Sequence, residues 1–175
     1  MLKTIAIIFA VIIVAVLIYA ATRPDTFRVE RSASIKAPPE KIFPHINDFH
    51  QWQAWSPWEK IDPAAKTNHS GTNNGVGAVY EWNGNNEVGQ GRMEIIESLP
   101  SSKVLLKIDF IKPFEGHNTI EFTLAPQGDT TTVTQAMYGS SPYLSKVMCL
   151  FFSMDKMVGS KYEEGLANLK AIAEQ

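Results

Sequence analysis

The sequence predicts an α+β protein in which a curved antiparallel sheet of about six or seven strands wraps around a long C-terminal helix, with an N-terminal transmembrane helix in front. Three observations predict this arrangement. An unbroken apolar run covers Ile5–Ala21. Short alternating stretches separated by turn residues follow, which is typical of consecutive strands. From Pro142 onward, apolar residues recur at three- and four-residue steps, which is typical of helices.

The apolar run Ile5–Ala21 is long enough to cross a lipid bilayer, because a spanning helix needs roughly 17 to 25 residues. The alternative is a cleaved secretory signal, whose apolar core is usually about 7–15 residues long. The run exceeds that length, and the bulky Ile18 and Tyr19 precede the small residues at its end. These features favour an uncleaved anchor that contacts the bilayer through the whole run.

Two units are expected along the chain, residues 1–24 as the anchor with its linker and residues 25–175 as one folded domain. The second unit has the length of an ordinary single domain. Because a short basic head usually stays in the cytoplasm, the domain is expected on the extracytoplasmic side of the membrane. The net charge of −2 offers no basic surface for nucleic acid, so nucleic acid is not an expected partner.

The first strand is predicted at Phe27–Ile35, where apolar and polar residues alternate and only Arg31 interrupts the apolar set. Pro39 suits the first turn of a helix, and Glu40 complements the positive end of the helix dipole. Pro44 limits that helix, so two short helices are expected up to the tryptophans around position 55 rather than one long helix.

Six more strands are predicted between turn residues: Thr67–Ser70, Ala78–Trp82, Glu87–Leu99, Lys103–Phe110, His117–Leu124 and Thr130–Tyr138. The segment Asn83–Asn86 predicts a hairpin, because Asn and Gly accept positive φ angles. Gly89 and Gly91 predict a bend or a bulge. Short connections between successive strands imply an antiparallel meander.

The C-terminal helical region contains Gly159, which predicts a kink or a break between two helices. The last part, Ser160–Glu174, has an apolar face and a charged face. The apolar face is expected to cover one face of the sheet. A curved sheet gripping a helix leaves a cavity between them, where ligands tend to bind.

Several short strings carry a family resemblance beyond this order of elements. They are Val29–Arg31 and Ile35–Pro38 in the first strand, Trp52–Trp58 after the short helices, Phe110–Phe114, and Asp155–Gly159 with Gly165–Lys170 in the last helix. On these strings, residues 27–173 resemble the polyketide cyclase/dehydrase and lipid-transport family of the START-like, birch-pollen-allergen-like (SRPBCC) superfamily. The resemblance implies a helix-grip fold. It does not select a chemistry, because the superfamily includes lipid carriers, quinone binders, cyclases, lyases and co-chaperones.

Aromatic and methionine side chains are expected to line the cavity, because they suit apolar ligands of variable shape. Ordinary core packing explains each of them singly. Phe114 lies in the loop Lys112–His117, where family members often have a mobile lid hinged here at Gly116; the alternative is a plain hairpin connection. The expected ligand-binding residues are Trp55, Tyr80, Trp82, Phe110, Phe114, Phe122, Met137, Phe151, Met154 and Met157.

The sharpest local signal is the cluster of Trp52, Trp55 and Trp58. The three-residue spacing puts the first two on one side of a helical turn. Two interpretations are open. The rings line the mouth of the cavity or touch the bilayer interface, where Trp is favoured, or they close the end of the core and fix the following loop.

Motifs for metal, cofactor or covalent chemistry are missing from the sequence. The histidines, at positions 45, 50, 69 and 117, lack the spacing of a zinc site, so no metal is expected. No phosphate loop, dinucleotide fingerprint or nucleophile elbow is present, so no cofactor is expected. Cys149 lies among apolar residues and is expected to be a buried small hydrophobe. Strand carboxylates such as Glu94 and Asp109 are expected to face water.

These observations favour a membrane-anchored module that binds or transports a hydrophobic small molecule, which is a lipid, a fatty acid, a quinone or a polyketide-like compound. Such ligands partition into bilayers, so the anchor and the cavity support one interpretation. The alternatives are an enzyme of the cyclase or dehydratase kind and a ligand-free stress-response or interaction module. An enzyme needs a titratable group in the cavity with a polar partner in reach.

Overall fold

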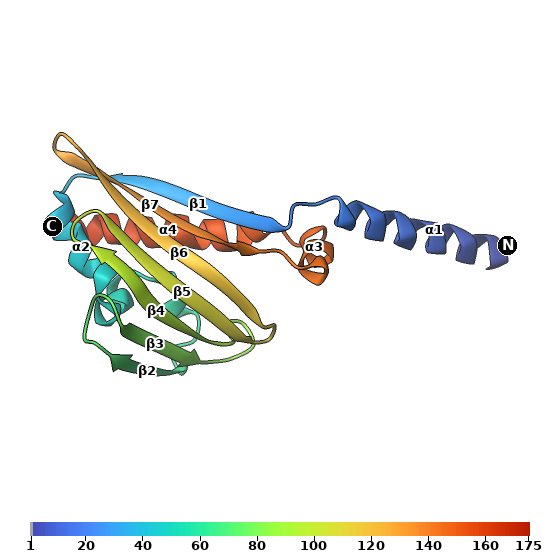
Figure 1. Ribbon diagram of the computed structural model, residues 1–175, viewed down its shortest axis with the longest axis horizontal. Coiled ribbons are helices and arrows are strands. Elements are labelled where there is room, and N and C mark those ends of the chain that lie inside the picture. Colours follow the sequence, from blue (N-terminus) through green and yellow to red (C-terminus); the bar gives the residue numbers. More distant parts are fainter. Residues whose placement is uncertain (1) are drawn as a thin grey trace.

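The computed structural model describes residues 2–175 and confirms the predicted α+β fold (Figure 1). A curved antiparallel sheet of seven strands lies against the C-terminal helix α4, and helix α1 projects from one end of the domain. Residue 1 of the predicted anchor lies outside the described residues.

The bounds of the elements follow the sequence pattern closely. The helices are α1 (Leu2–Ala21), α2 (Pro39–Asn47), α3 (Tyr143–Cys149) and α4 (Met154–Ala173), with two 3-10 helices, η1 (Phe49–Ala54) and η2 (Pro57–Lys60). The strands are β1 (Thr26–Ile35), β2 (Lys66–Gly71), β3 (Ala78–Asn83), β4 (Gln90–Leu99), β5 (Lys103–Lys112), β6 (Gly116–Gln127) and β7 (Thr130–Ser140).

The strand order is β1-β7-β6-β5-β4-β3-β2, so β2 to β7 form the predicted meander. Strand β1 is separated from its partner in sequence and pairs with β7, from Thr26↔Ser140 to Ile35↔Thr131. This pairing places the first strand beside the last. Helix α4 follows β7 and packs against β1, and it therefore lies across one face of the sheet (Figure 1).

The sheet face that meets α4 carries the hydrophobic core. On β6 every second residue is buried, namely Ile120, Phe122 and Leu124. Helix α4 contributes Leu166 and Leu169, which are also buried. The alternation along the strands and the helical repeat thus converge on one layer between sheet and helix.

Helix α4 runs unbroken through Gly159, so a break between two helices at that residue is wrong. The break lies earlier, at residues 150–153 between α3 and α4. Gly159 instead makes room for Arg31, because a Cβ atom there would lie 2.2 Å from Arg31 Nη2. The Arg31 guanidinium donates to Asp155 Oδ1 at 2.9 Å and to Glu163 Oε1 at 2.5 Å. The charge that interrupts the first strand therefore joins β1 to α4.

Strand β4 begins at Gln90, later than the predicted Glu87. The reason is Gly89, whose φ of +66° keeps it in the turn before the strand. The register of β4 and β5 shifts between Gln90 and Gly91, which confirms the predicted bulge.

Helix α1 is long and apolar enough to cross a bilayer over Lys3–Ala21, with a mean hydropathy of 3.0. A helix of this kind near the N-terminus is a candidate for a membrane anchor or a signal sequence. Its C-terminal end contacts the domain. Ala20 is fully buried, and the Leu17 carbonyl accepts a hydrogen bond of 2.9 Å from the Tyr143 hydroxyl of α3.

Cys149 is exposed, so its predicted burial is wrong. It ends the short helix α3, which lies at the end of the domain from which α1 projects (Figure 1). The apolar side chains around it, Leu144, Phe151 and Phe152, are exposed as well. An apolar sequence neighbourhood does not bury a residue when the whole segment lies outside the core.

The contact between Arg31 and Gly159 predicts an unusual result for Gly159→Ala. Replacing a glycine inside a helix by alanine ordinarily stabilises a protein by about 0.5–1 kcal/mol. We expect no such gain here, because the added methyl group displaces Arg31 from its carboxylate partners. In an Arg31→Ala background, the same substitution is expected to raise the free energy of unfolding by the ordinary amount. Urea unfolding of the four proteins measures this coupling.

Ser160→Ala is the matched control, because Ser160 is the next residue of α4 and is exposed. It is expected to change the free energy of unfolding equally in both backgrounds. Equal stabilisation by Gly159→Ala with and without Arg31 would show that the arginine does not require the glycine.

Candidate functional site

The main cavity of the domain lies between the sheet and α4 and has a volume of about 550 Å³. Its walls come from strands β2 to β7, from η1 and η2, and from residues 158–165 of α4. The alternating strands supply side chains from one sheet face, and α4 supplies Val158, Tyr162 and the small Gly165. The predicted cavity between sheet and C-terminal helix is therefore present.

All four tryptophans of the sequence line this cavity. Trp52 and Trp55 are buried, and their indole N–H groups donate to the carbonyl oxygens of Ile46 at 3.0 Å and His45 at 2.9 Å. These bonds fix the two rings against α2. Trp58 is partly exposed and lies at the cavity rim. Trp52 and Trp55 combine parts of the two interpretations, because they belong to the hydrophobic core and also line the cavity.

A second aromatic row crosses the sheet beneath the cavity. Tyr80 and Trp82 stack with their ring centroids 6.2 Å apart, and Trp82 meets Phe110 edge-on at 6.1 Å. Gly91 lies under the Trp82 ring, where a Cβ atom would come within 2.3 Å of it. The glycine that forms the bulge thus also lets Trp82 lie flat across β4, which keeps the indole in the cavity wall.

Five of the ten residues expected to bind a ligand line the cavity: Trp55, Tyr80, Trp82, Phe110 and Met137. The other five do not. Phe122 is fully buried behind the cavity wall, where it meets the rings of Trp52 and Trp55 edge-on at 6.0 and 6.1 Å. It is a core residue, so the cavity surface stops short of it.

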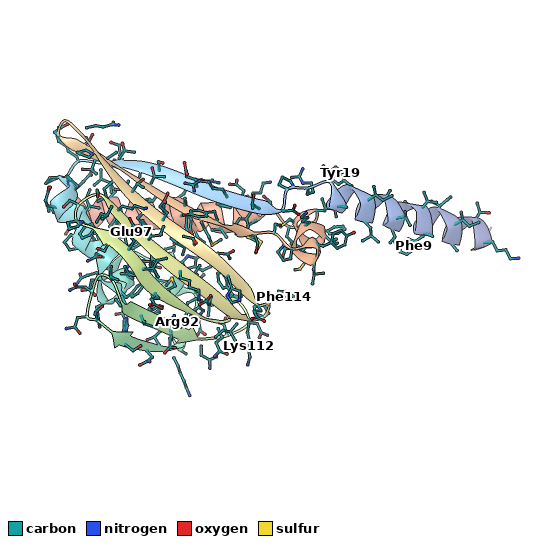
Figure 2. The ribbon with its side chains drawn as sticks, in the orientation of Figure 1. Phe9, Tyr19, Arg92, Glu97, Lys112 and Phe114 are labelled. Carbon is teal, nitrogen blue, oxygen red and sulfur yellow. The ribbon has the colours of Figure 1, made fainter. Side chains whose placement is uncertain are left out.

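Phe114, Phe151 and Met157 point away from the cavity and are 61%, 70% and 61% exposed. Figure 2 shows Phe114 at the tip of the hairpin between β5 and β6. From this loop, Lys112 and Pro113 line the cavity and the Phe114 ring does not.

On α4 the inward face is set by Val158 and Tyr162, which are one turn apart. Met157 is displaced from Val158 by one residue, about 100° around the helix, and so faces out. Met154 is only half-buried in the first turn, beyond the cavity. Helical spacing alone did not identify which turn of α4 faces the cavity.

The sequence analysis did not assign the polar residues of the cavity wall, among them Glu59, Gln135 and Tyr162. A signal for one of them existed. Gln135 has the same parity along β7 as Val133 and Met137, so strand alternation already placed its side chain on the core face. Glu59 had no such signal, because η2 is too short to show a period.

Polar chemistry in the cavity centres on two places. The Tyr80 hydroxyl donates to Glu59 Oε1 at 2.7 Å, and burial raises the pKa of Tyr80, with the carboxylate acting in the same direction. Burial also raises the pKa of Tyr162 on α4, and contact with Gln135 opposes this effect. Both phenols are therefore neutral at physiological pH.

The histidines lie away from a metal-binding arrangement. His50 and His69 stack with ring centroids 4.4 Å apart, and burial lowers the pKa of His69, as it does for His45. Within residues 2–175, no three side chains of His, Cys, Asp or Glu converge as a metal site would require.

A family model described as polyketide cyclase / dehydrase and lipid transport matches residues 26–174. The chain belongs to this family. The match covers the whole sheet and α4, so the cavity described above lies entirely within the family's domain. No curated protein matches the chain.

Solved structures similar to this polyketide cyclase/dehydrase family member share its fold at low sequence identity. Protein CV1439 from Chromobacterium violaceum has a TM-score of 0.61 and 17% identity, covering 87% of this chain and 99% of its own. The Aha1 dimer from Colwellia psychrerythraea has a TM-score of 0.58 and 20% identity, covering 85% and 96%. The di-domain ARO/CYC StfQ from the steffimycin biosynthetic pathway has a TM-score of 0.61 and 12% identity, covering 85% and 51%.

Proposed function

We propose that this protein is a membrane-anchored binding module for a hydrophobic small molecule, held between the sheet and α4. The observation that carries the proposal is the cavity of about 550 Å³ walled by four tryptophans. Small-molecule sites usually measure about 300–1,000 Å³ and are lined mainly by apolar and aromatic groups. The candidate ligands are a lipid, a fatty acid, a quinone or a polyketide-like compound.

The hydrophobic effect supplies the affinity in this proposal. Burial of apolar ligand surface contributes about 25 cal/mol per Å², from which the loss of ligand freedom is subtracted. The rings of Trp52 and Trp55 are already fixed by hydrogen bonds to α2, so they lose little conformational freedom on binding. A rigid aromatic wall of this kind lowers the cost of association.

Two features of the chain support the anchor over a cleaved signal. The Tyr143 hydroxyl of α3 bonds to the Leu17 carbonyl, which lies inside the apolar run, and Ala20 is fully buried. Cleavage after the run would remove both contacts. If α1 spans the bilayer, α3 must then lie at the membrane surface, and its exposed Leu144 and the following Phe151 and Phe152 fit that position.

The cavity predicts different effects for two adjacent substitutions on α4. Val158→Glu places a carboxylate in the cavity wall and is expected to weaken binding of ω-bromoundecanol at least about tenfold, because an apolar ligand cannot solvate the charge. Bromine quenches indole fluorescence, and all four tryptophans line the cavity. Fluorescence titration of the full chain in lipid nanodiscs therefore reads binding without a label.

Met157→Glu is the matched control, because Met157 is exposed and lies outside the cavity wall. It is expected to bind the probe as the wild type does. Absence of quenching in the wild type, or equal loss in both variants, would contradict a ligand site between the sheet and α4.

The lone cysteine provides a test of the membrane arrangement. A nitroxide attached to Cys149, exposed at the end of α3, is expected to collide more with oxygen than with a water-soluble nickel complex when the full chain is in nanodiscs. Oxygen concentrates in the bilayer, so this ratio reports depth. The control carries Cys149→Ser with Asn74→Cys, in an exposed loop next to α2. Equal ratios at both sites would contradict membrane contact by α3.

A cyclase or dehydratase is the second candidate, favoured by the Tyr80–Glu59 pair in the cavity wall. Glu59 can accept a proton from a substrate as a general base, and the Tyr80 hydroxyl that donates to it holds the carboxylate in position. Tyr80→Phe is expected to leave ω-bromoundecanol binding unchanged. If the protein is an enzyme, the variant loses conversion of a linear poly-β-ketone into aromatic product, followed by absorbance. Absence of conversion by the wild type would leave the binding module as the function.

A further inference from the structure

The cavity wall contains one buried polar atom whose hydrogen-bonding capacity is unused. Gln135 lies on the core face of β7, is 5% exposed and lines the cavity. Among residues 2–175, no group donates a hydrogen bond to its side-chain oxygen Oε1. A buried amide oxygen without a partner is unfavourable, and a bound water, ion or ligand can supply the missing hydrogen bond.

The neighbours of Gln135 in the sheet do not supply this partner. Its cross-strand neighbours are Arg31 on β1 and Phe122 on β6. The Arg31 guanidinium is engaged with Asp155 and Glu163 of α4, and Phe122 has no polar group. The remaining direction is the cavity itself.

Tyr162 lies across from Gln135 on α4, lines the same cavity and contacts the Gln135 amide. Within the described part of the chain, no acceptor takes the hydroxyl proton of Tyr162. The two side chains therefore present an acceptor, Gln135 Oε1, and a donor, Tyr162 O–H, at one point of the cavity wall. The Tyr80 hydroxyl, by contrast, already donates its hydrogen bond to Glu59.

We propose that Gln135 and Tyr162 form a binding subsite for a hydroxyl group on the hydrophobic ligand. A hydroxyl fits because it donates one hydrogen bond and accepts another. A hydrocarbon offers neither, and a fatty-acid carboxylate offers no donor to Gln135. The ligand class is thus a long-chain or ring-bearing alcohol or phenol. This inference rests on the proposed function, since it specifies the ligand of the same cavity.

The test compares two probes that differ only in the hydroxyl group, ω-bromoundecanol and bromoundecane. Both are titrated against the full chain in lipid nanodiscs, with quenching of tryptophan fluorescence as the readout. Gln135→Met keeps the length of the side chain and removes its polar atoms. It is expected to reduce the affinity for the alcohol roughly five- to tenfold and to leave the affinity for bromoundecane unchanged. Comparison of each probe across variants cancels its partitioning into lipid.

Two further variants complete the design. Gln127→Met makes the same substitution at an exposed glutamine at the end of β6, outside the cavity wall, and is expected to bind both probes as the wild type does. Tyr162→Phe removes the donor and keeps the ring, and it is expected to reduce alcohol affinity in the same direction as Gln135→Met. It also tests the subsite should Gln135→Met fail to fold, which circular dichroism detects.

The outcomes separate the subsite from the function it rests on. Quenching by both probes, with alcohol affinity unchanged in Gln135→Met and Tyr162→Phe, overturns the subsite and leaves the binding module standing. Such a result would mean that water satisfies Gln135. Absence of quenching by either probe in the wild type overturns the proposed function as well.

Discussion

The packing of Trp52 and Trp55 against Phe122 is the contact on which the rest of the domain depends. Phe122 belongs to the middle of the sheet, and the two indoles are bonded through their N–H groups to α2. The Trp55 carbonyl in turn accepts a hydrogen bond from Asn168 of α4 at 3.0 Å. One buried aromatic cluster therefore holds the short helices, the sheet and the long helix together, and burial of rings this large dominates core energetics.

The cavity follows from where this cluster lies along α4. Toward the C-terminus of the helix, Leu166 and Leu169 pack directly into the core. Toward its N-terminus, Val158 and Tyr162 face open volume instead, and the helix is held to the sheet edge by Arg31. The domain is thus closed at one end and hollow at the other. The N-terminal end of α4 follows α3, which lies at the end of the domain from which α1 projects (Figure 1).

Much of the site could be predicted from the periodicity of the sequence. The wrong assignments in the C-terminal helical region came from the helical faces. Alternation along β3, β5 and β7 placed Tyr80, Phe110 and Met137 on the inner face, because side chains in a strand have only two directions. Met157 was assigned inward although it lies one residue, about 100°, from the inward Val158 on α4. Phe151 was assigned inward from helical spacing that ran across residues 150–153, where the helix in fact ends. A break in the helix changes which way every residue before it points, and Gly159 was the wrong marker for that break.

The sequence by itself determined the fold class, the strand positions, the bulge at Gly91 and the apolar α1, because these depend on local patterns of burial and backbone geometry. Only the tertiary structure decided that Gly159 accommodates Arg31, that Cys149 is exposed, and that the Gln135 side-chain oxygen finds no donor among residues 2–175. Each of these depends on a contact between elements far apart in the chain. Local sequence sets which face a side chain is on, but it does not state what stands across from it.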